Sequence, residues 1–408
     1  FAQECKELLF DKDGKYYFND GTIVTAPDKK TAIERFNKYK NSIELFNKGD
    51  QLFIKQNYKE AVEYFKKAYE LGSTRAAVNL GYCYKCGLGV EPDNYKAFEY
   101  YMRAASSGEK VAQYSVANLF VEYKNYEAAA EFFEKAANQG HVLAQRSIGD
   151  CYYKGQGVRR NYTKAAEWYE KAASQGDAGA QNSLAYCYFE GTGVAQSYLD
   201  AVKWYAKAAN QGDTDAQFYL GYMYSEGLGV SQDYVESVKW YQKAADAGER
   251  DAIFCLANKY YNGQGVAQDY NKALELYRKA AAKGEYTSMY VIAECYTYGR
   301  GVPKDLEQAK YWKQKAMELE NKNKELSDQT LRSQAELINY RKRKDDELSR
   351  MLKYAGEDMI KELLQILDNF ERAINMDDDN LEDEVSKFLS GFKMIYCKFV
   401  SILEKNGV

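Results

Sequence analysis

Residues 177–212 carry the pattern that decides the fold: DAGAQNSLAYCYFEGTGVAQSYLDAVKWYAKAANQG. An alanine-rich apolar run over about 178–189 begins behind Asp177, whose carboxylate can accept hydrogen bonds from the free amides of a first helical turn. The GTGV that follows predicts a stop, because glycine adopts the left-handed conformation that ends helices. A second run, over about 198–210, closes at Gly212. The stretch therefore predicts two helices joined as a hairpin.

The same pattern recurs along the chain with a fixed period. Five GxGV loops begin 36 residues apart, at Gly155, Gly191, Gly227, Gly263 and Gly299. An alanine of the second helix recurs in the same steps from position 68 to 316, with one step of 32, which gives eight hairpins. Because one hairpin cannot bury its own apolar face, stacked neighbours must supply a shared core. The sequence predicts an all-α chain with an α-solenoid over residues 41–318.

Two further registers predict the core of this solenoid. A large ring recurs in the second helices, at Trp168, Trp204, Trp240 and Trp312. A cysteine recurs four residues before the loop glycines, at Cys83, Cys151, Cys187 and Cys295. Met223 occupies the same slot, which indicates packing rather than chemistry. Equivalent positions on stacked hairpins lie about 10 Å apart, beyond the reach of a disulfide. We expect free thiols and a reducing, cytoplasmic compartment.

These residues resemble the Sel-one-like repeat family, a relative of the tetratricopeptide repeats. The resemblance rests on LGYMYSEGLGVSQDY (220–234) followed by VKWYQKAADAG (238–248), and it covers about residues 75–318. The unit at 43–72 looks more like an ordinary tetratricopeptide hairpin, and the unit at 111–140 has KNY in place of the glycine loop. The resemblance implies an adaptor whose curved surface binds a protein or peptide.

Several other functions find little support in the sequence. GxGV recurs between helices, with no preceding strand and no GK[ST], so a nucleotide site is not expected. The only histidine, His141, lies where other hairpins have helix-capping acids, and Cys83 and Cys86 form a lone CxxC. With no second histidine, serine elbow or fixed acidic pair, we expect no enzyme, no cofactor and no metal site. A formal net charge of −4 gives no bulk positive field for nucleic acid or membrane.

The two ends of the chain differ from the array. Alternation around Asp13-Gly14 in ELLFDKDGKYYF predicts a small β-hairpin within residues 1–40. After Pro303 there is no glycine or proline until Gly356, and none after that until Gly391. One helix is therefore predicted from about 305 to 374, with the segment 319–374 lying beyond the array. A further helix is expected within residues 375–408.

The long helix carries an apolar stripe that needs a partner. Its large members are Leu348, Leu352, Met359, Leu363, Ile366, Phe370 and Ile374. The terminal helix carries a second stripe, with Phe388, Phe392, Ile395 and Phe399. Two such hairpins from two chains can bury both stripes in a four-helix bundle, at roughly 1.5–3 kcal/mol for each large side chain. We therefore expect a homodimer joined by these residues.

The same residues carry a second resemblance. LINYRKRKDDELSRMLKYAGEDMIKELLQILDNFERAI (337–374) and VSKFLSGFKMIYCKFVSILEKNGV (385–408) resemble GrpE, the family that exchanges nucleotide on DnaK-type chaperones. The resemblance implies a parallel dimer of long helices. It also matches Arg341 and Arg350 to positions where the family's helix touches the chaperone, with Lys342, Arg343 and Lys344 beside them. A solvated basic face explains these five residues equally well.

GrpE proteins continue past the terminal GV into a β domain that opens the chaperone's nucleotide cleft, whereas this sequence stops at Val408. Either the sequence is cut, or exchange is lost and docking and dimerisation remain. The leading hypothesis is a GrpE-type exchange cochaperone whose repeat array binds an unidentified protein or peptide. The alternative is a homodimeric scaffold without exchange activity.

Overall fold

The computed structural model describes residues 8–12, 14–18 and 21–374, beginning with a small antiparallel sheet. Its strands are β1 (Leu8–Lys12), β2 (Lys15–Phe18) and β3 (Ile23–Thr25), in the order β1-β2-β3. The predicted hairpin is thus confirmed, with Lys12 opposite Lys15 across the turn, and a third strand extends it. Phe18 stacks on Phe36 with ring centroids 3.7 Å apart, so the sheet packs on the first helix.

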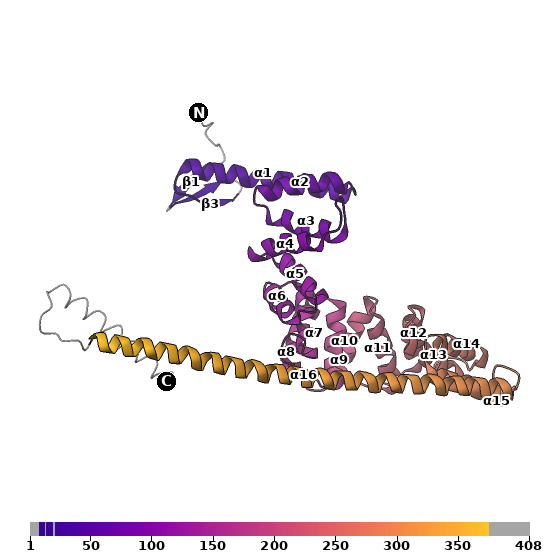
Figure 1. The fold of residues 1–408 in the computed structure, drawn as a ribbon. Coiled ribbons are helices and arrows are strands. Elements are labelled where there is room, and N and C mark those ends of the chain that lie inside the picture. Colours follow the sequence, from indigo (N-terminus) through magenta and orange to yellow (C-terminus); the bar gives the residue numbers. More distant parts are fainter. Residues whose placement is uncertain (1–7, 13, 19–20, 375–408) are drawn as a thin grey trace, which may run out of the picture. The chain divides into compact units, whose positions relative to one another are not determined.

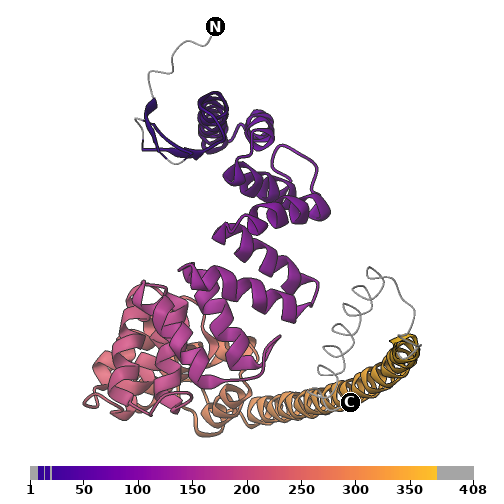
Figure 2. The ribbon, with the colours of Figure 1, turned by 90° about the vertical axis from the view of Figure 1, so that its left-hand side faces the viewer.

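Fifteen helices follow in chain order, and each contacts the next, as Figures 1 and 2 show. The first, α1, spans Lys29–Ile54. The others each have 13 residues: α2 (Tyr58–Glu70), α3 (Thr74–Cys86), α4 (Asn94–Ser106), α5 (Lys110–Glu122), α6 (Tyr126–Asn138), α7 (Val142–Lys154), α8 (Tyr162–Ser174), α9 (Ala178–Glu190), α10 (Tyr198–Asn210), α11 (Thr214–Glu226), α12 (Tyr234–Asp246), α13 (Arg250–Asn262), α14 (Tyr270–Ala282) and α15 (Tyr286–Tyr298). The predicted solenoid of helical hairpins is confirmed.

The two glycines of each GxGV loop are required for different structural reasons. The first glycine of GxGV is the left-handed C-cap of the preceding helix, as Gly191 is for α9 with φ +70°. The second faces the previous hairpin: a Cβ on Gly193 would lie 2.1 Å from the carbonyl oxygen of Tyr162. This second glycine therefore lets the loop touch the backbone of the neighbouring hairpin.

A ladder of glutamines joins consecutive hairpins. Gln181 Nε2 donates to the Ala173 carbonyl oxygen at 3.1 Å, and Gln211 Nε2 donates to Gln181 Oε1 at 2.8 Å. Gln113 and Gln145 make the same pair of contacts in earlier hairpins. A buried amide without hydrogen-bond partners is costly. Each glutamine is therefore satisfied only when the adjoining hairpin packs in this one register.

The short hairpin α5/α6 forms without a glycine loop, as predicted. Lys124 takes the left-handed position with φ +59°, and its amide donates to the Val121 carbonyl oxygen at 2.9 Å. The cysteine register is confirmed as core, and the tryptophan register in part, since Trp204 and Trp312 are half-buried. Cys187 and Met223 are fully buried, and Trp168 and Trp240 are nearly so.

The last helix, α16, spans Leu306–Ile374 without interruption, close to the predicted 305–374. Its first turns contribute the buried Ala309 and Ala316. The chain divides into two compact units between Ala316 and Met317. Within the described ranges, no helix is both long and apolar enough to cross a membrane.

Candidate functional site

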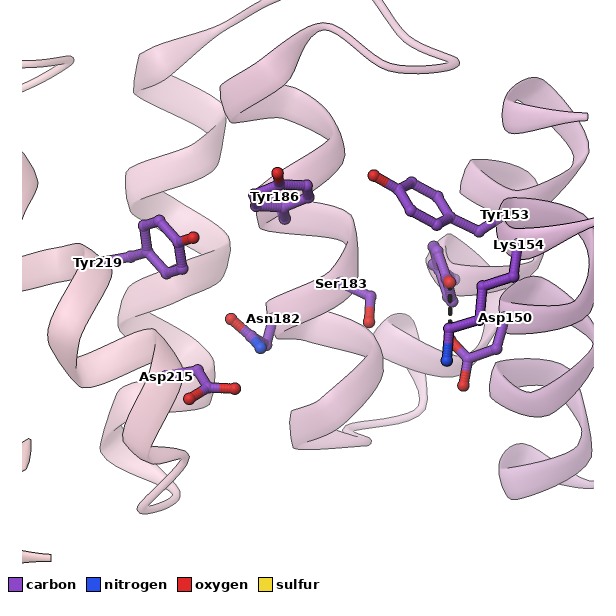
Figure 3. A pocket seen from close by; sticks show the side chains of 9 residues that line it. Asp150, Tyr153, Lys154, Asn182, Ser183, Tyr186, Asp215 and Tyr219 are labelled. Atoms are coloured by element: carbon purple, nitrogen blue, oxygen red, sulfur yellow. Dashed lines mark hydrogen bonds between the residues drawn. The ribbon is translucent and has the colours of Figure 1, made fainter. Parts of the chain in front are cut away.

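A trough of about 340 Å³ lies over the first helices of three consecutive hairpins, α7, α9 and α11 (Figure 3). One side is a row of tyrosines, one from each helix: Tyr153, Tyr186 and Tyr219. Polar side chains form a second row: Asp150, Asn182, Ser183 and Asp215. Lys154 and Tyr169 complete the lining at the α7 end. The volume falls within the range of about 300–1,000 Å³ that is usual for ligand pockets.

The tyrosine row runs diagonally across the repeats. Its members are 33 residues apart, three fewer than the repeat period, so each lies almost one helical turn earlier than the last. Tyr186 and Tyr219 meet edge to face, with ring centroids 6.0 Å apart, and Tyr219 stacks on Tyr205 at 5.2 Å. This packing holds the rings of the row in place.

Polar atoms below the trough are not all satisfied. The hydroxyl of Tyr169 donates to Asp150 Oδ1 at 2.7 Å. One repeat later Tyr186 replaces the aspartate, and the hydroxyl of the fully buried Tyr205 has no partner among the described residues. Asn182 Oδ1, on the polar row itself, also lacks one there. The hydrogen-bonding capacity of this part of the array is therefore not exhausted.

The trough has a negative local environment. Burial raises the pKa of Tyr219, and the neighbouring Tyr186, Asp215 and Glu190 raise it further. The pKa of Tyr186 is raised by burial and by Glu190. The carboxylates of Asp215 and Glu190 are thus near the α9 and α11 end of the tyrosine row, which favours a positively charged ligand over an anion.

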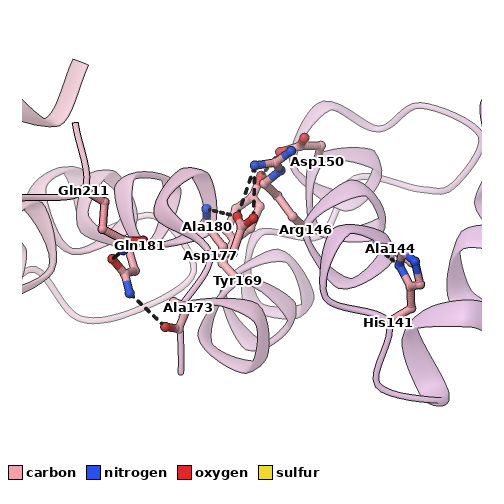
Figure 4. Close-up of polar contacts among 10 residues, drawn as sticks. All are labelled: His141, Ala144, Arg146, Asp150, Tyr169, Ala173, Asp177, Ala180, Gln181 and Gln211. Atoms are coloured by element: carbon pink, nitrogen blue, oxygen red, sulfur yellow. Dashed lines mark hydrogen bonds and ion pairs between the residues drawn. The ribbon is translucent and has the colours of Figure 1, made fainter. Parts of the chain in front are cut away.

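Ion pairs and caps fix the helices that carry the trough (Figure 4). Arg146 of α7 donates to Asp177 Oδ1 at 3.1 Å, and the same carboxylate accepts the Ala180 amide at the start of α9. A Cβ on Gly179 would lie 2.3 Å from the guanidinium, so glycine makes room for it. His141 caps α7 by accepting the Ala144 amide at Nδ1, 3.2 Å away, which confirms its predicted capping role.

Lys259 is a buried charge that the predicted core does not include. Lys259 occupies the slot that holds Cys187 and Met223 in other hairpins, and only 7% of it is exposed. Its Nζ donates to Ser225 Oγ at 2.7 Å and lies 4.3 Å from the ring centre of Tyr234. Burial lowers its pKa. The sequence could have indicated this burial, because Lys259 lies four residues before Gly263, in the slot that cysteine or methionine fills elsewhere.

The predicted chaperone-binding residues all lie on α16. Lys342, Arg343 and Lys344 are exposed, and Lys344 Nζ forms an ion pair with Glu347 at 2.7 Å. Arg341 and Arg350 belong to the same helix, with side chains outside the described set. Positions 343 and 350 are seven apart and lie within about 20° of each other around the helix, whereas positions 341 and 344 are about 60° apart and lie well away from that face. Lys342 lies in neither pair, so the five residues do not share one face of the helix.

The predicted dimerisation residues are placed only in part. Seven of them fall within α16: Leu348, Leu352, Met359, Leu363, Ile366, Phe370 and Ile374. Their side chains lie outside the described set. The other four, Phe388, Phe392, Ile395 and Phe399, lie outside the described residues altogether. The dimeric bundle stays a prediction.

Comparison with known families divides the chain in two. The Sel1 repeat family matches seven segments: 44–73, 74–109, 112–141, 142–177, 178–213, 214–249 and 251–285. They include the segment 44–73, so the Sel1 family extends to the unit at 43–72 that looks more like an ordinary tetratricopeptide hairpin. A solved protective antigen from uropathogenic Escherichia coli, with an SLR fold, is 34% identical with a TM-score of 0.60. The match covers 63% of this chain and 56% of the antigen.

Residues 303–408 match the GrpE family. A protein named GrpE from Brevibacillus choshinensis is 35% identical over 102 residues, which are 25% of this chain and 52% of that protein. One from Borreliella burgdorferi is 40% identical over 91 residues, 22% of this chain and 48% of that protein. The chain thus spans about half the length of these curated relatives.

Proposed function

Because the chain belongs to the Sel1 repeat family and its residues 303–408 match GrpE, we propose that it is a GrpE-type cochaperone carrying a partner-binding array. The terminal part docks on a DnaK-type chaperone and promotes release of its adenyl nucleotide. The array binds a protein or peptide. Both roles are binding roles, so no reaction chemistry, cofactor, nucleic acid or membrane is assigned to the chain, and we place it in the cytoplasm.

The observation that carries the proposal is the position of the basic cluster. Lys342, Arg343 and Lys344 are exposed on an uninterrupted helix, inside the segment that matches GrpE. Arginine and lysine on a rigid helix can form charge-assisted hydrogen bonds to acidic groups of a partner. Because α16 begins inside the array and runs into this segment, one continuous element links partner capture to chaperone docking.

Nucleotide release tests the proposal. A DnaK-type chaperone is loaded with fluorescent ADP, and the decay of fluorescence is followed with and without the chain. We expect faster release with the wild type. Replacing Arg343 and Arg350 together by alanine should reduce the acceleration about tenfold if they form a docking row. The matched control replaces Lys322 and Lys324, two exposed lysines of the same helix, and should leave release unchanged.

A homodimeric scaffold without exchange activity is the second candidate. It rests on the Sel1 repeats, which account for residues 44–285 and on this candidate carry the whole function. On this alternative the wild-type chain does not accelerate ADP release. Affinity capture with the intact chain would then recover array partners and no DnaK-type chaperone, and the two assays together separate the candidates.

A further inference from the structure

We propose that the trough over α7, α9 and α11 binds a lysine or arginine side chain of an extended peptide segment. This inference rests on the proposed partner-binding role of the array and specifies the chemistry of its ligand. The residues that select the basic side chain are Asp215, Tyr186 and Tyr219.

Asp215 supplies a carboxylate that the chain does not use. The neighbouring acids have partners: Asp177 pairs with Arg146, and Asp213 accepts the Ala216 amide as the cap of α11. Asp215 lines the trough and makes no hydrogen bond or ion pair among the described residues. It lies in the first turn of α11. A charged acceptor is therefore available at this end of the trough.

Tyr219, on the same helix as Asp215, has one face stacked on Tyr205, and among the described residues neither it nor Tyr186 has a cation of the chain over its ring. Elsewhere the chain places its own lysines over aromatic faces, as with Lys207 over Trp204 at 3.7 Å and Lys243 over Trp240 at 3.8 Å. Aromatic faces attract ammonium and guanidinium groups, most strongly where water is excluded. A carboxylate beside such rings recognises a basic side chain.

The surrounding charge agrees with this assignment. Glu190 and Asp251 lie close enough to Tyr219 to raise its pKa together with Asp215. Arg250 neutralises Asp251 through an ion pair of 2.8 Å, whereas Lys154 lies at the opposite, α7 end of the trough. An acidic ligand would meet the carboxylate of Asp215 at the α11 end. A basic one meets a cation of the lining, Lys154, at the α7 end.

An extended segment fits the shape of the lining. The tyrosine and polar rows run side by side across three helices (Figure 3), so a strand-like peptide can lie along them. Ser183 and Asn182 lie midway between the ends, where the peptide backbone would pass. Asn182 Oδ1 lacks a partner there, and a small side-chain rotation would let it accept a peptide amide.

Binding to peptide pools tests the inference. The intact chain is applied to immobilised octapeptide pools that have a fixed central Arg, Lys, Gln, Glu or Leu and random flanks. We expect the Arg and Lys pools to retain about tenfold more protein than the Gln and Glu pools, with the difference shrinking at high salt. Asp215→Asn should abolish the preference. Tyr186→Leu should weaken it, and Tyr186→Phe should keep most of it because the ring remains.

The matched control is Glu131→Gln, which removes the same charge from an exposed i,i+4 pair on α6. Thermal melts by circular dichroism confirm that each variant folds. Equal retention of all pools, retention of none, or an unchanged preference in Asp215→Asn would overturn the inference. ADP release is measured on the same proteins. A flat peptide result with intact release rejects this inference alone, and selective peptide binding without release rejects the exchange role alone.

Discussion

One tyrosine position in the second helices finds a different environment in successive hairpins. The hydroxyl of Tyr169 donates to Asp150, and that of Tyr277 donates to Asn258 at 2.5 Å. Tyr205 occupies the same position but faces a hairpin in which the acceptor has been replaced by Tyr186. The repeat keeps the ring for packing, while the hydrogen bond depends on a second residue that varies.

This difference predicts opposite effects of one substitution. Tyr205→Phe should raise the free energy of unfolding by about 1 kcal/mol, because it removes a buried hydroxyl without a partner. Tyr169→Phe should lower it by about 1–2 kcal/mol, because Asp150 loses a hydrogen bond. Urea unfolding followed by circular dichroism measures both. Equal effects of the two substitutions would contradict the assigned hydrogen bonds.

His141 makes the cap of α7 sensitive to pH. Its neutral imidazole accepts the Ala144 amide, and burial together with Lys110 lowers its pKa below the ordinary 6.5. Above 6.5 both folded and unfolded states are neutral and the cap is intact. Between 6.5 and the lowered folded pKa the unfolded state binds more protons, so stability falls as the pH falls.

We therefore expect the wild type to lose up to about 1 kcal/mol relative to His141→Asn between pH 7 and pH 5, since an asparagine cap does not titrate. Melting temperatures of the two proteins across this range provide the measurement. A constant difference between them would show that His141 does not carry the pH dependence.

At the scale of the element, the GxGV loop performs two separate tasks. Gly191 ends α9 in the left-handed region, while Gly193 allows the loop to contact the Tyr162 carbonyl of the preceding hairpin. Gly212 also has a positive φ, of +92°, but a Cβ there would meet nothing within 4 Å. A side chain at Gly212 would therefore cause backbone strain alone, whereas one at Gly193 would also clash with the neighbouring hairpin.

Alanine substitutions at these positions should differ in cost. Gly212→Ala adds strain alone and should destabilise the array by about 1–2 kcal/mol. Gly193→Ala adds a collision with backbone and should cost about 3 kcal/mol or more. Hydrogen exchange read by mass spectrometry should show the loss of protection in Gly193→Ala at the junction of the α7/α8 and α9/α10 hairpins. Similar exchange in both variants would mean that the close contact is not required.

At the scale of the whole molecule, the chain joins a repeat array to a helix that extends far beyond it. Array hairpins bury their apolar faces against sequence neighbours, so stability accumulates along the array. The apolar positions of α16 beyond residue 347 have no repeat partner in the sequence pattern. A second copy of the chain is the partner that the stripe predicts.

Sedimentation of the intact chain should therefore report the mass of two chains. Replacing Leu363 and Phe370 together by glutamate should produce single chains, because charges in the stripe oppose its burial. Leu326→Glu is the matched control, since Leu326 lies on α16 and is 51% exposed. A one-chain mass for the wild type, or dissociation by Leu326→Glu, would contradict the predicted bundle.

The basic cluster on α16 could be predicted from the sequence, whereas the trough could not. Arg341 to Lys344 formed a local cluster on one uninterrupted helix, so the sequence could point to them directly. The trough offered no such signal. Tyr153, Tyr186 and Tyr219 recur every 33 residues, which differs from the period of 36, and a search for the repeat treats them as ordinary packing residues. For a similar reason the burial of Lys259 was not predicted: the core slot was recognised from cysteine and methionine, and a lysine does not match that apolar pattern.

The sequence by itself determined the helices, their loops and the order in which they stack. Caps, glycines and apolar periods act within one hairpin or between adjacent ones, so local residues specify them. Only the tertiary structure decided which side chains from different hairpins meet: the tyrosine row beside Asp215, the unpaired hydroxyl of Tyr205, and the loop against the Tyr162 carbonyl. The physical reason is that these contacts depend on the rotation of each hairpin relative to the last, which the repeat period alone does not specify.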